Sequence, residues 1–266
     1  MIVERAAALL AEHGIETARV DAEWIVAHML GVTRSELATR NEDIDDGAVW
    51  PLVERRTLRE PLAYVLGEWG FRRLTLRSDA RALVPRPETE TVVERCLELL
   101  HDVERPRVLD VGTGTGAIAL ALADELEGAD IVATDASADA LELARENAQR
   151  TGLRVDFVHA DLRDGLPPGP FDLVVSNPPY VRPEEIDSLE PEVRDWEPRE
   201  ALVDEGQTEA LARAALDVLQ PGAMLVLEAH AERASEVGAM LETLGYDVRI
   251  TSDLTGRDRV VEGKRP

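Results

Sequence analysis

Hydrophobic residues in the first 60 positions recur every three or four residues, as at Ala7 and Leu10. Residues at this spacing lie on one face of an α-helix, so the pattern predicts a series of short amphipathic helices. One run stops at Gly31, and glycine is favoured just past the end of a helix. The sequence Thr33–Glu36 has the Ser/Thr-x-x-Glu spacing of a capping box and predicts the start of another short helix. We therefore expect a small N-terminal bundle of helices that carries no chemistry of its own.

The pattern changes between residues 61 and 87. Alternating apolar positions at 74–76, bounded by glycine upstream, predict a β-hairpin. The sequence Pro85–Pro87 favours an extended backbone, and Glu88 and Glu90 fall in the first turn of the next helix, where carboxylates suit the helix dipole. This segment has two interpretations, a rigid linker before a helix or a wall of an active site.

From residue 107 onward, short apolar runs alternate with helical patterns. The predicted strands cover residues 108–111, 131–134, 155–158, 171–175, 224–227, 248–250 and 259–261. Strands separated by helices indicate an α/β fold with a mainly parallel sheet. The last two strands follow each other as a hairpin-like pair, so we expect a seven-stranded doubly wound sheet with an antiparallel edge strand.

Length and composition are consistent with this organisation. The 266 residues are enough for one large domain and a small one. We expect an N-terminal helical bundle over 1–72, suited to gripping a partner or bracing the neighbouring domain, a β-hairpin connector over 73–87 and the α/β domain over 88–266. The single cysteine, Cys96, excludes a disulfide framework and is predicted to be a packed core thiol.

No segment suggests a membrane or secreted protein. No run approaches the ~20 apolar residues that span a bilayer, and the charged residues Glu4 and Arg5 come too early for a signal peptide. We expect a cytoplasmic protein without a membrane partner, and we expect it to be a monomer.

The charge is strongly negative. Lys and Arg total 29 and Asp and Glu total 53, a net charge of −24, and Lys264 is the single lysine. The electrostatic field of so large a negative charge repels phosphate backbones and disfavours free nucleic acid as a substrate. A coding bias toward arginine explains the scarcity of lysine but not the large acidic excess. Adaptation to high internal salt explains the acidic excess, and we favour this explanation.

Glycines follow the first strand of the sheet as Gly112-x-Gly114-x-Gly116, at the start of a helix, where the backbone can approach a ligand closely. Asp135 ends the second strand and is placed to hydrogen-bond a ribose. The glycine spacing differs from the Gly-x-Gly-x-x-Gly of dinucleotide sites, although a dinucleotide remains an alternative. An acid before the glycines, at Asp110, suits a cationic amino-acid group, so the strand ends together favour S-adenosylmethionine. The predicted cofactor-binding residues are Asp110, Gly112, Thr113, Gly114, Thr115, Gly116, Asp135, Asp161, Leu162 and Asn177; no metal site is expected.

The fourth strand, 171–175, stops abruptly at Asn177-Pro178-Pro179-Tyr180. Two prolines cannot continue a sheet ladder, so these residues project from the rim where α/β sheets bind ligands. The nitrogen of a planar NH2 group is a poor nucleophile because its lone pair is delocalised. The Asn177 side-chain oxygen and the Pro178 carbonyl can accept both N–H groups and favour a pyramidal nitrogen, while Tyr180 packs on the flat acceptor. We assign catalysis to Asn177, Pro178 and Tyr180, and substrate binding to these and Pro179; a plain strand-to-loop turn is the alternative.

These features resemble the HemK family, the release factor glutamine methyltransferases. The matching motifs are Pro61–Gly67, Leu83–Glu90, Asp110–Ala119, Val175–Val181, Glu197–Leu202 and Asp253–Arg259. The resemblance implies a class I S-adenosylmethionine-dependent methyltransferase of the bacterial type. It also implies N5-methylation of the glutamine in the Gly-Gly-Gln loop of peptide chain release factors, with the N-terminal helices holding the factor. The chain departs from the family at Gly222-Ala223 and at Glu228–Ala231, where Gly-Gly and a Glu-x-Gly turn are usual.

Three other functions compete with this one. Asn-Pro-Pro-Tyr also occurs in N6-adenine DNA methyltransferases, but the net charge of −24 and the lack of a basic arm disfavour DNA. A module that only senses the cofactor would not need the intact Asn-Pro-Pro-Tyr sequence. A dinucleotide-dependent oxidoreductase is the most distant of the three.

Overall fold

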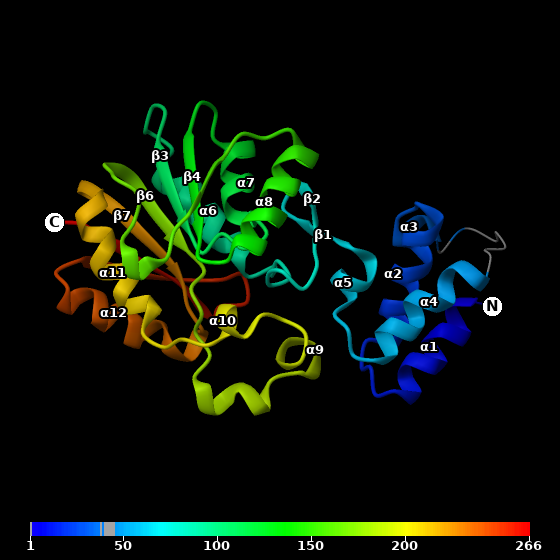
Figure 1. The fold of residues 1–266 in the computed structure, drawn as a ribbon. Helices are drawn as coiled ribbons and strands as arrows, with labels where there is room; N and C mark the ends of the chain where they lie inside the picture. The colour runs from blue at the N-terminus through cyan, green and yellow to red at the C-terminus, as the bar shows by residue number, and fades with distance from the viewer. Residues whose placement is uncertain (1, 38, 40–45) are drawn as a thin grey trace. The chain divides into compact units, whose positions relative to one another are not determined.

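The structure is a computed structural model that describes residues 2–37, 39 and 46–266. The chain forms two compact units (Figure 1). The helical unit comprises Met1–Glu68 together with Leu189–Trp196, and the sheet unit comprises Trp69–Ser188 with Glu197–Pro266. In the described part of the chain, every helix is too short or too polar to cross a membrane.

Short helices build the helical unit, and those within the first 60 residues agree with the predicted apolar spacing. They are α1 (Ile2–Glu12), α2 (Ala18–Leu30), α3 (Arg34–Leu37), α4 (Asp46–Thr57), α5 (Leu62–Leu66) and α9 (Pro191–Arg194). Gly31 ends α2 in the left-handed conformation with φ 64°. The capping box at the start of α3 is confirmed, because the Thr33 N–H donates to the Glu36 carboxylate at 2.8 Å and the Glu36 N–H donates to Thr33 Oγ1 at 3.2 Å.

A buried ion-pair network ties α9 to the helices of this unit. The Arg56 guanidinium donates to Asp21 Oδ2 at 2.7 Å and to Glu192 Oε1 at 2.8 Å, and the side chains of Arg56 and Asp21 are each 6% exposed. Arg59 also pairs with Glu192 at 2.7 Å. The segment 189–196 is thereby held in the helical unit although the strand-helix pattern surrounds it in the sequence.

Replacing Arg56 with methionine is expected to destabilise the helical unit by about 3–5 kcal/mol, because Asp21 is left as a buried, unpaired charge. Urea denaturation followed by circular dichroism measures this loss. Arg19→Met, which removes an exposed pairing with Glu23, is the matched control and should leave the midpoint nearly unchanged. An unchanged midpoint in Arg56→Met would contradict the importance of this network.

All seven strands predicted from the sequence form one sheet in the sheet unit. They are β3 (Arg107–Val111), β4 (Asp130–Asp135), β5 (Asp156–His159), β6 (Phe171–Ser176), β7 (Leu219–Glu228), β8 (Asp247–Ser252) and β9 (Asp258–Lys264). Their order is β5-β4-β3-β6-β7-β9-β8, and β3 to β7 are mutually parallel. The antiparallel strand is β9, which lies between β7 and the edge strand β8. The predicted α/β fold class is confirmed.

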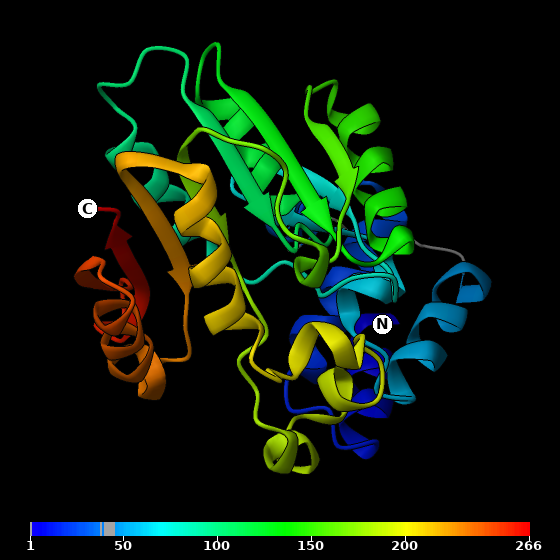
Figure 2. The same ribbon diagram turned by 60° about the vertical axis from the view of Figure 1, so that its left-hand side comes forward.

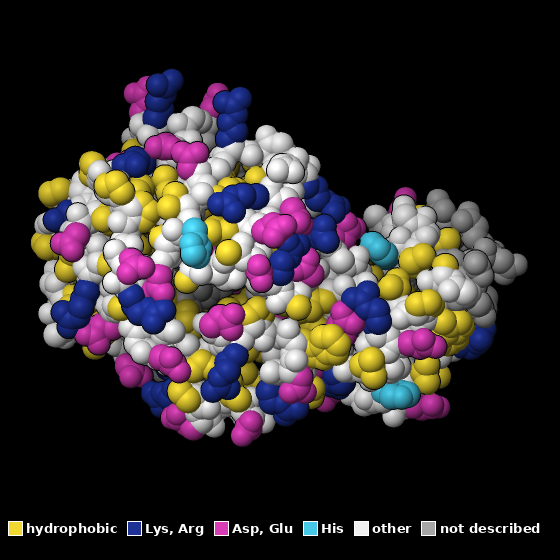
Figure 3. Space-filling view, in the orientation of Figure 1, with side chains coloured by type: hydrophobic (Ala, Val, Ile, Leu, Met, Phe, Trp, Pro, Cys, Tyr) yellow, Lys and Arg dark blue, Asp and Glu magenta, His cyan; other side chains and the backbone are white. Residues whose placement is uncertain are grey.

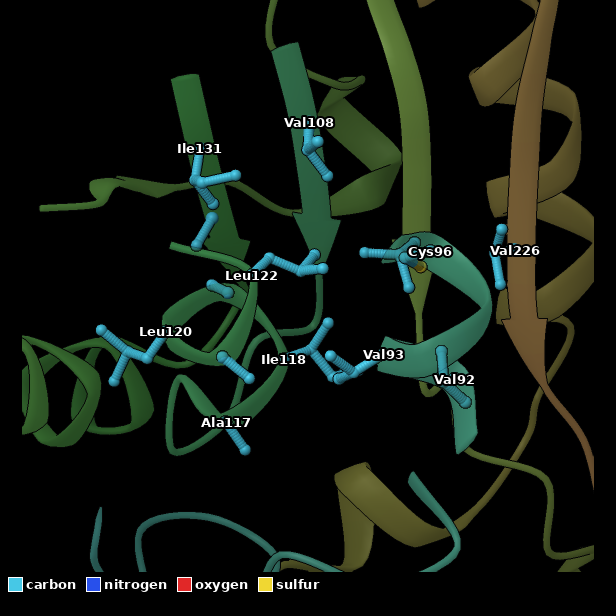
Figure 4. Packing of buried hydrophobic residues seen from close by; sticks show 14 of the residues in the cluster. Val92, Val93, Cys96, Val108, Ala117, Ile118, Leu120, Leu122, Ile131 and Val226 are labelled. Atoms are coloured by element: carbon cyan, nitrogen blue, oxygen red, sulfur yellow. The ribbon is translucent and has the colours of Figure 1, made fainter. Parts of the chain in front are cut away.

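Helices cover both faces of this sheet (Figures 1 and 2). One face carries α6 (Thr89–Leu99), α7 (Ala117–Glu125) and α8 (Ala138–Thr151), and the other carries α11 (Gln207–Val218) and α12 (Ala234–Thr243). Side chains of β3 alternate between the two cores, with Val108 facing α6 and α7 and Leu109 facing the other layer (Figure 4). Cys96 of α6 is fully buried in the first core, and burial raises its thiol pKa, so the packed-thiol prediction is confirmed.

The remaining elements are short. A two-stranded sheet pairs β1 (Glu68–Phe71) with β2 (Leu74–Arg77). One further helix, α10 (Arg199–Leu202), and three 3₁₀ turns over Leu162–Asp164, Pro183–Ser188 and Ala231–Arg233 complete the described elements.

Candidate active site

Four parallel strands end at one rim of the sheet. Because β5, β4, β3 and β6 are neighbours in that order, the segments after their carboxyl ends lie close together. The Ser176 hydroxyl at the end of β6 donates to the Val111 carbonyl at the end of β3, at 2.6 Å. This bond fixes the Asn-Pro-Pro-Tyr segment against the strand that leads into the glycine loop.

The glycine loop follows β3 and opens α7. Gly112, Gly114 and Gly116 have φ values of 73°, 56° and 83°, which residues with a Cβ rarely adopt. A Cβ on Gly116 would also lie 3.1 Å from Leu120 Cδ1, whereas a Cβ on Gly112 would meet no atom within 4 Å. The loop is therefore tightly packed at its helix end and open at its strand end.

Asp110 is a buried carboxylate beneath this loop. Its Oδ2 accepts the Thr113 hydroxyl at 2.6 Å, while Oδ1 is buried without a hydrogen-bond partner among the described residues. Burial raises the pKa of Asp110 to about 7, opposed by the Thr113 bond and by the nearby Ala119 N–H, which does not form a hydrogen bond with Oδ1. An unpartnered buried acceptor of this kind can receive a cationic donor.

Asp135 ends β4 beside the loop. Its carboxylate accepts the Gly114 N–H and the Ser137 N–H, each at 2.9 Å. Burial raises its pKa, and the backbone donors partly oppose that rise. Each oxygen keeps one lone pair for a ligand hydroxyl, because a carboxylate oxygen accepts up to two hydrogen bonds.

Asp161 and Leu162 follow β5, adjacent to Asp135. The Asp161 carboxylate accepts the Arg163 backbone N–H at 2.9 Å and pairs with the Arg163 guanidinium, which lowers its pKa to about 2. Leu162 is half-buried against the core on the α11 side. The structure places both residues at the expected rim, while their contact with a cofactor stays a prediction.

Asn177 contacts a segment far from it in the sequence. Its Nδ2 donates to the hydroxyl of Thr89, the first residue of α6, at 3.3 Å. The Thr89 hydroxyl in turn donates to Glu228 Oε2 at 2.6 Å. The start of α6, just after the Pro85–Pro87 segment, therefore reaches the Asn-Pro-Pro-Tyr sequence, which favours an active-site wall over a simple linker.

The residues after Asn177 are held by the segment that follows β7. Tyr180 is half-buried, its ring centroid lies 6.1 Å from that of His230, and burial raises its pKa to about 12. Arg233 donates to the Tyr180 carbonyl and pairs with Glu185. Pro178 is buried and Pro179 half-buried. His230 itself is exposed.

Glu228 and Arg233 are not among the site residues predicted from the sequence, and Thr89 lies only within the Leu83–Glu90 motif. Glu228 lies 139 positions from Thr89 along the chain, and the contact depends on the order of strands in the sheet. The sequence held one indication of this contact, because Leu83–Glu90 is among the motifs that carry the family resemblance. That match pointed to the segment but gave Thr89 no role.

Comparisons with known proteins find two matching family models and several similar proteins. The family model described as "PrmC N-terminal domain" matches residues 2–67, and the "Methyltransferase small domain" model matches residues 93–212. The chain is 45% identical to the release factor glutamine methyltransferase of Deinococcus radiodurans, over 99% of this chain and 97% of that protein. It is 40% identical to the protein of the same name from Chlorobaculum tepidum, over 95% and 92% respectively.

The structure also resembles solved methyltransferase structures. A methyltransferase of Pyrococcus furiosus superposes with a TM-score of 0.51 at 21% identity, covering 72% of this chain and 89% of that one. At this level of identity the likeness shows a shared fold.

Proposed function

The chain belongs to the release factor glutamine methyltransferase family, and from this premise we propose that it methylates the side-chain amide nitrogen (N5) of a glutamine in peptide chain release factors. The glutamine is that of the Gly-Gly-Gln motif, and the methyl donor is S-adenosylmethionine. The observation that carries the proposal is the position of Asn177 directly after β6 and beside the glycine loop, with its amide nitrogen hydrogen-bonded to Thr89.

The residues at the strand ends fit S-adenosylmethionine. The unpartnered Asp110 Oδ1 suits its ammonium group, the open strand end of the glycine loop suits its amino-acid portion, and Asp135 suits its ribose hydroxyls. Asp161 and Leu162 would hold the adenine by a polar edge and an apolar face. When bound, this cofactor supplies an electrophilic methyl group on a positively charged sulfur.

Asn177 and Pro178 prepare the acceptor nitrogen. The Asn177 Oδ1 and the Pro178 carbonyl accept the two N–H groups of the glutamine amide and hold its nitrogen in one orientation. Both acceptors become better partners as the nitrogen gains positive charge, so they stabilise the transition state more than the ground state. Tyr180 and Pro179 flank the flat amide.

No strong base is needed before methyl transfer, because the nitrogen's proton becomes acidic only as the new bond forms. Tyr180, with a pKa raised to about 12, stays protonated at neutral pH and packs on the acceptor. His230 is exposed and is not required as a base.

The helical unit is proposed to hold the release factor. It carries partly exposed apolar side chains on α2, with Val20, Trp24 and Met29 each 38% exposed. Such side chains suit a protein partner, and the net charge of −24 disfavours a nucleic acid. We propose that residues 1–72 recognise the substrate, 73–87 connect and 88–266 catalyse, in a protein that acts as a cytoplasmic monomer.

Incubation with methyl-labelled S-adenosylmethionine and either a release factor or duplex DNA tests the proposal. Label is expected in the release factor and absent from DNA. Label in DNA alone would instead support N6-adenine methylation by the same Asn-Pro-Pro-Tyr site.

The acidic surface leads to a salt prediction. Asp and Glu side chains are interspersed with arginines on the face in Figure 3, and the whole chain carries a net −24. We propose adaptation to high salt, since a Debye length of about 3 Å in 1 M salt screens such self-repulsion. Methyl transfer to the release factor should rise between low and molar KCl. A flat or falling curve would leave coding bias as the better explanation.

A further inference from the structure

Three side chains, those of Asn177, Thr89 and Glu228, form a hydrogen-bonded relay that runs from the Asn-Pro-Pro-Tyr sequence into the protein. Asn177 Nδ2 donates to Thr89 Oγ1 at 3.3 Å, and the Thr89 hydroxyl donates to Glu228 Oε2 at 2.6 Å. Thr89 is 4% exposed and Glu228 2% exposed. The residues come from the end of β6, the start of α6 and the end of β7, so three elements meet at this point.

The direction of the hydrogen bonds in this relay is set by Glu228, its innermost residue. An ionised carboxylate can only accept hydrogen bonds, so the single hydrogen of the Thr89 hydroxyl points to Glu228. The Thr89 oxygen then offers only lone pairs to Asn177, and only the NH2 end of the Asn177 amide can pair with them. The network therefore distinguishes the two ends of the amide. Among the described residues, Asn177 Oδ1 has no hydrogen-bond partner of its own.

We propose that Thr89 and Glu228 are positioning residues that hold the Asn177 amide with Oδ1, rather than NH2, toward the substrate. This inference rests on the proposed function, because a glutamine NH2 group needs an acceptor at this place. A flipped Asn177 would present N–H donors to the N–H donors of the substrate, and no hydrogen bond could form. Without the relay, a fraction of the enzyme holds Asn177 in this inactive orientation.

Protonation of Glu228 is expected to release the constraint on the orientation of the Asn177 amide. The charged and titratable groups around it are Arg259 of β9, Arg86 and Glu88 ahead of α6, and Tyr180 after β6. Burial raises the pKa of Glu228 to about 7, opposed by the Thr89 hydrogen bond and by Arg259. A protonated Glu228 can donate to Thr89, whose own hydrogen is then free to turn to Asn177 and favour the flipped amide. The orientation of Asn177 therefore becomes better defined as pH rises and Glu228 ionises.

Variants of Thr89 test the relay at saturating S-adenosylmethionine. Thr89→Val removes the hydroxyl at nearly constant volume and should lower kcat for release factor methylation by about 10- to 100-fold, the effect of losing one charge-assisted hydrogen bond. Thr89→Ser keeps the hydroxyl and should recover most of the rate. The dissociation constant of the cofactor should not change, which separates positioning from a general loss of structure. Thr208→Val is the matched control, because Thr208 is a buried threonine of α11 that also donates to a carboxylate, that of Asp204 at 3.3 Å.

A pH profile tests Glu228. In the wild type, kcat should rise as pH passes through about 7, whereas Glu228→Gln cannot ionise and should give a lower and flatter profile. Glu262→Gln is the matched control, because Glu262 is a buried glutamate of β9 paired with Arg95 at 2.7 Å, outside the relay. It should keep the wild-type inflection.

A wild-type kcat in Thr89→Val, or a wild-type pH profile in Glu228→Gln, would overturn the relay. If Thr89→Val does not fold, the pH profile of Glu228→Gln decides the question alone. Absence of release factor methylation by the wild-type protein would instead count against the proposed function, so the two failures are distinguishable.

Discussion

Asn177→Ala is expected to lower kcat for release factor methylation by roughly 10²–10³-fold, the loss typical when one hydrogen-bonding group is removed from a preorganised site. The physical reason is that Asn177 Oδ1 accepts one of the two N–H groups of the glutamine amide. Without it, the amide keeps a delocalised lone pair and several orientations. Single-turnover kinetics with bound S-adenosylmethionine measures the chemical step directly.

The melting temperature should hardly change in Asn177→Ala, because Asn177 is only half-buried and makes one 3.3 Å side-chain bond. Cofactor affinity should fall by less than about tenfold, since Asn177 is one of many predicted cofactor contacts. Full activity in this variant would rule out the proposed mechanism.

Asp110→Asn is expected to weaken S-adenosylmethionine binding by about 10- to 100-fold, because the amide that turns its oxygen to Thr113 turns its NH2 group toward the ammonium group and the charge-assisted hydrogen bond is lost. Titration calorimetry measures this change. The fold should survive, because the substituted amide would keep an acceptor for Thr113 and the buried charge would be gone. Unchanged affinity would place the ammonium group of the cofactor elsewhere.

The same residue predicts a pH dependence with a definite sign. Asp110 has its pKa raised to about 7 in the folded protein, so the folded state binds more protons than the unfolded state between the usual aspartate pKa and pH 7. Without cofactor, stability should therefore fall as pH rises through this interval. Affinity for the cationic cofactor should rise over the same interval, and both trends should be weaker in Asp110→Asn.

Much of the fold follows from local patterns that the sequence displays. Most strands of the seven-stranded sheet contain a short apolar run, and the Thr33–Glu36 capping box forms with both of its hydrogen bonds. Such features depend on near neighbours in the chain. The strand ends could also be matched to their ligand-binding positions, because parallel strands place their carboxyl ends at one rim.

Other features depend on contacts between distant residues. The Arg56–Glu192 pair joins residues 136 positions apart and brings 189–196 into the helical unit, for which the sequence offers no periodic signal. The link from Glu228 to Thr89 likewise follows from the position of β7 beside β6 and the packing of α6 over them. A single sequence shows that these residues are polar, but the strand order that brings them together appears only in the folded chain.

Mass spectrometry of the Gly-Gly-Gln peptide of a release factor, before and after reaction with S-adenosylmethionine, shows whether this glutamine is methylated. We predict one added methyl group on the side-chain amide of that glutamine with the wild-type protein, and little or none with Asn177→Ala. A methyl group on any other residue, or an unmodified glutamine after prolonged reaction with the wild-type protein, would contradict it.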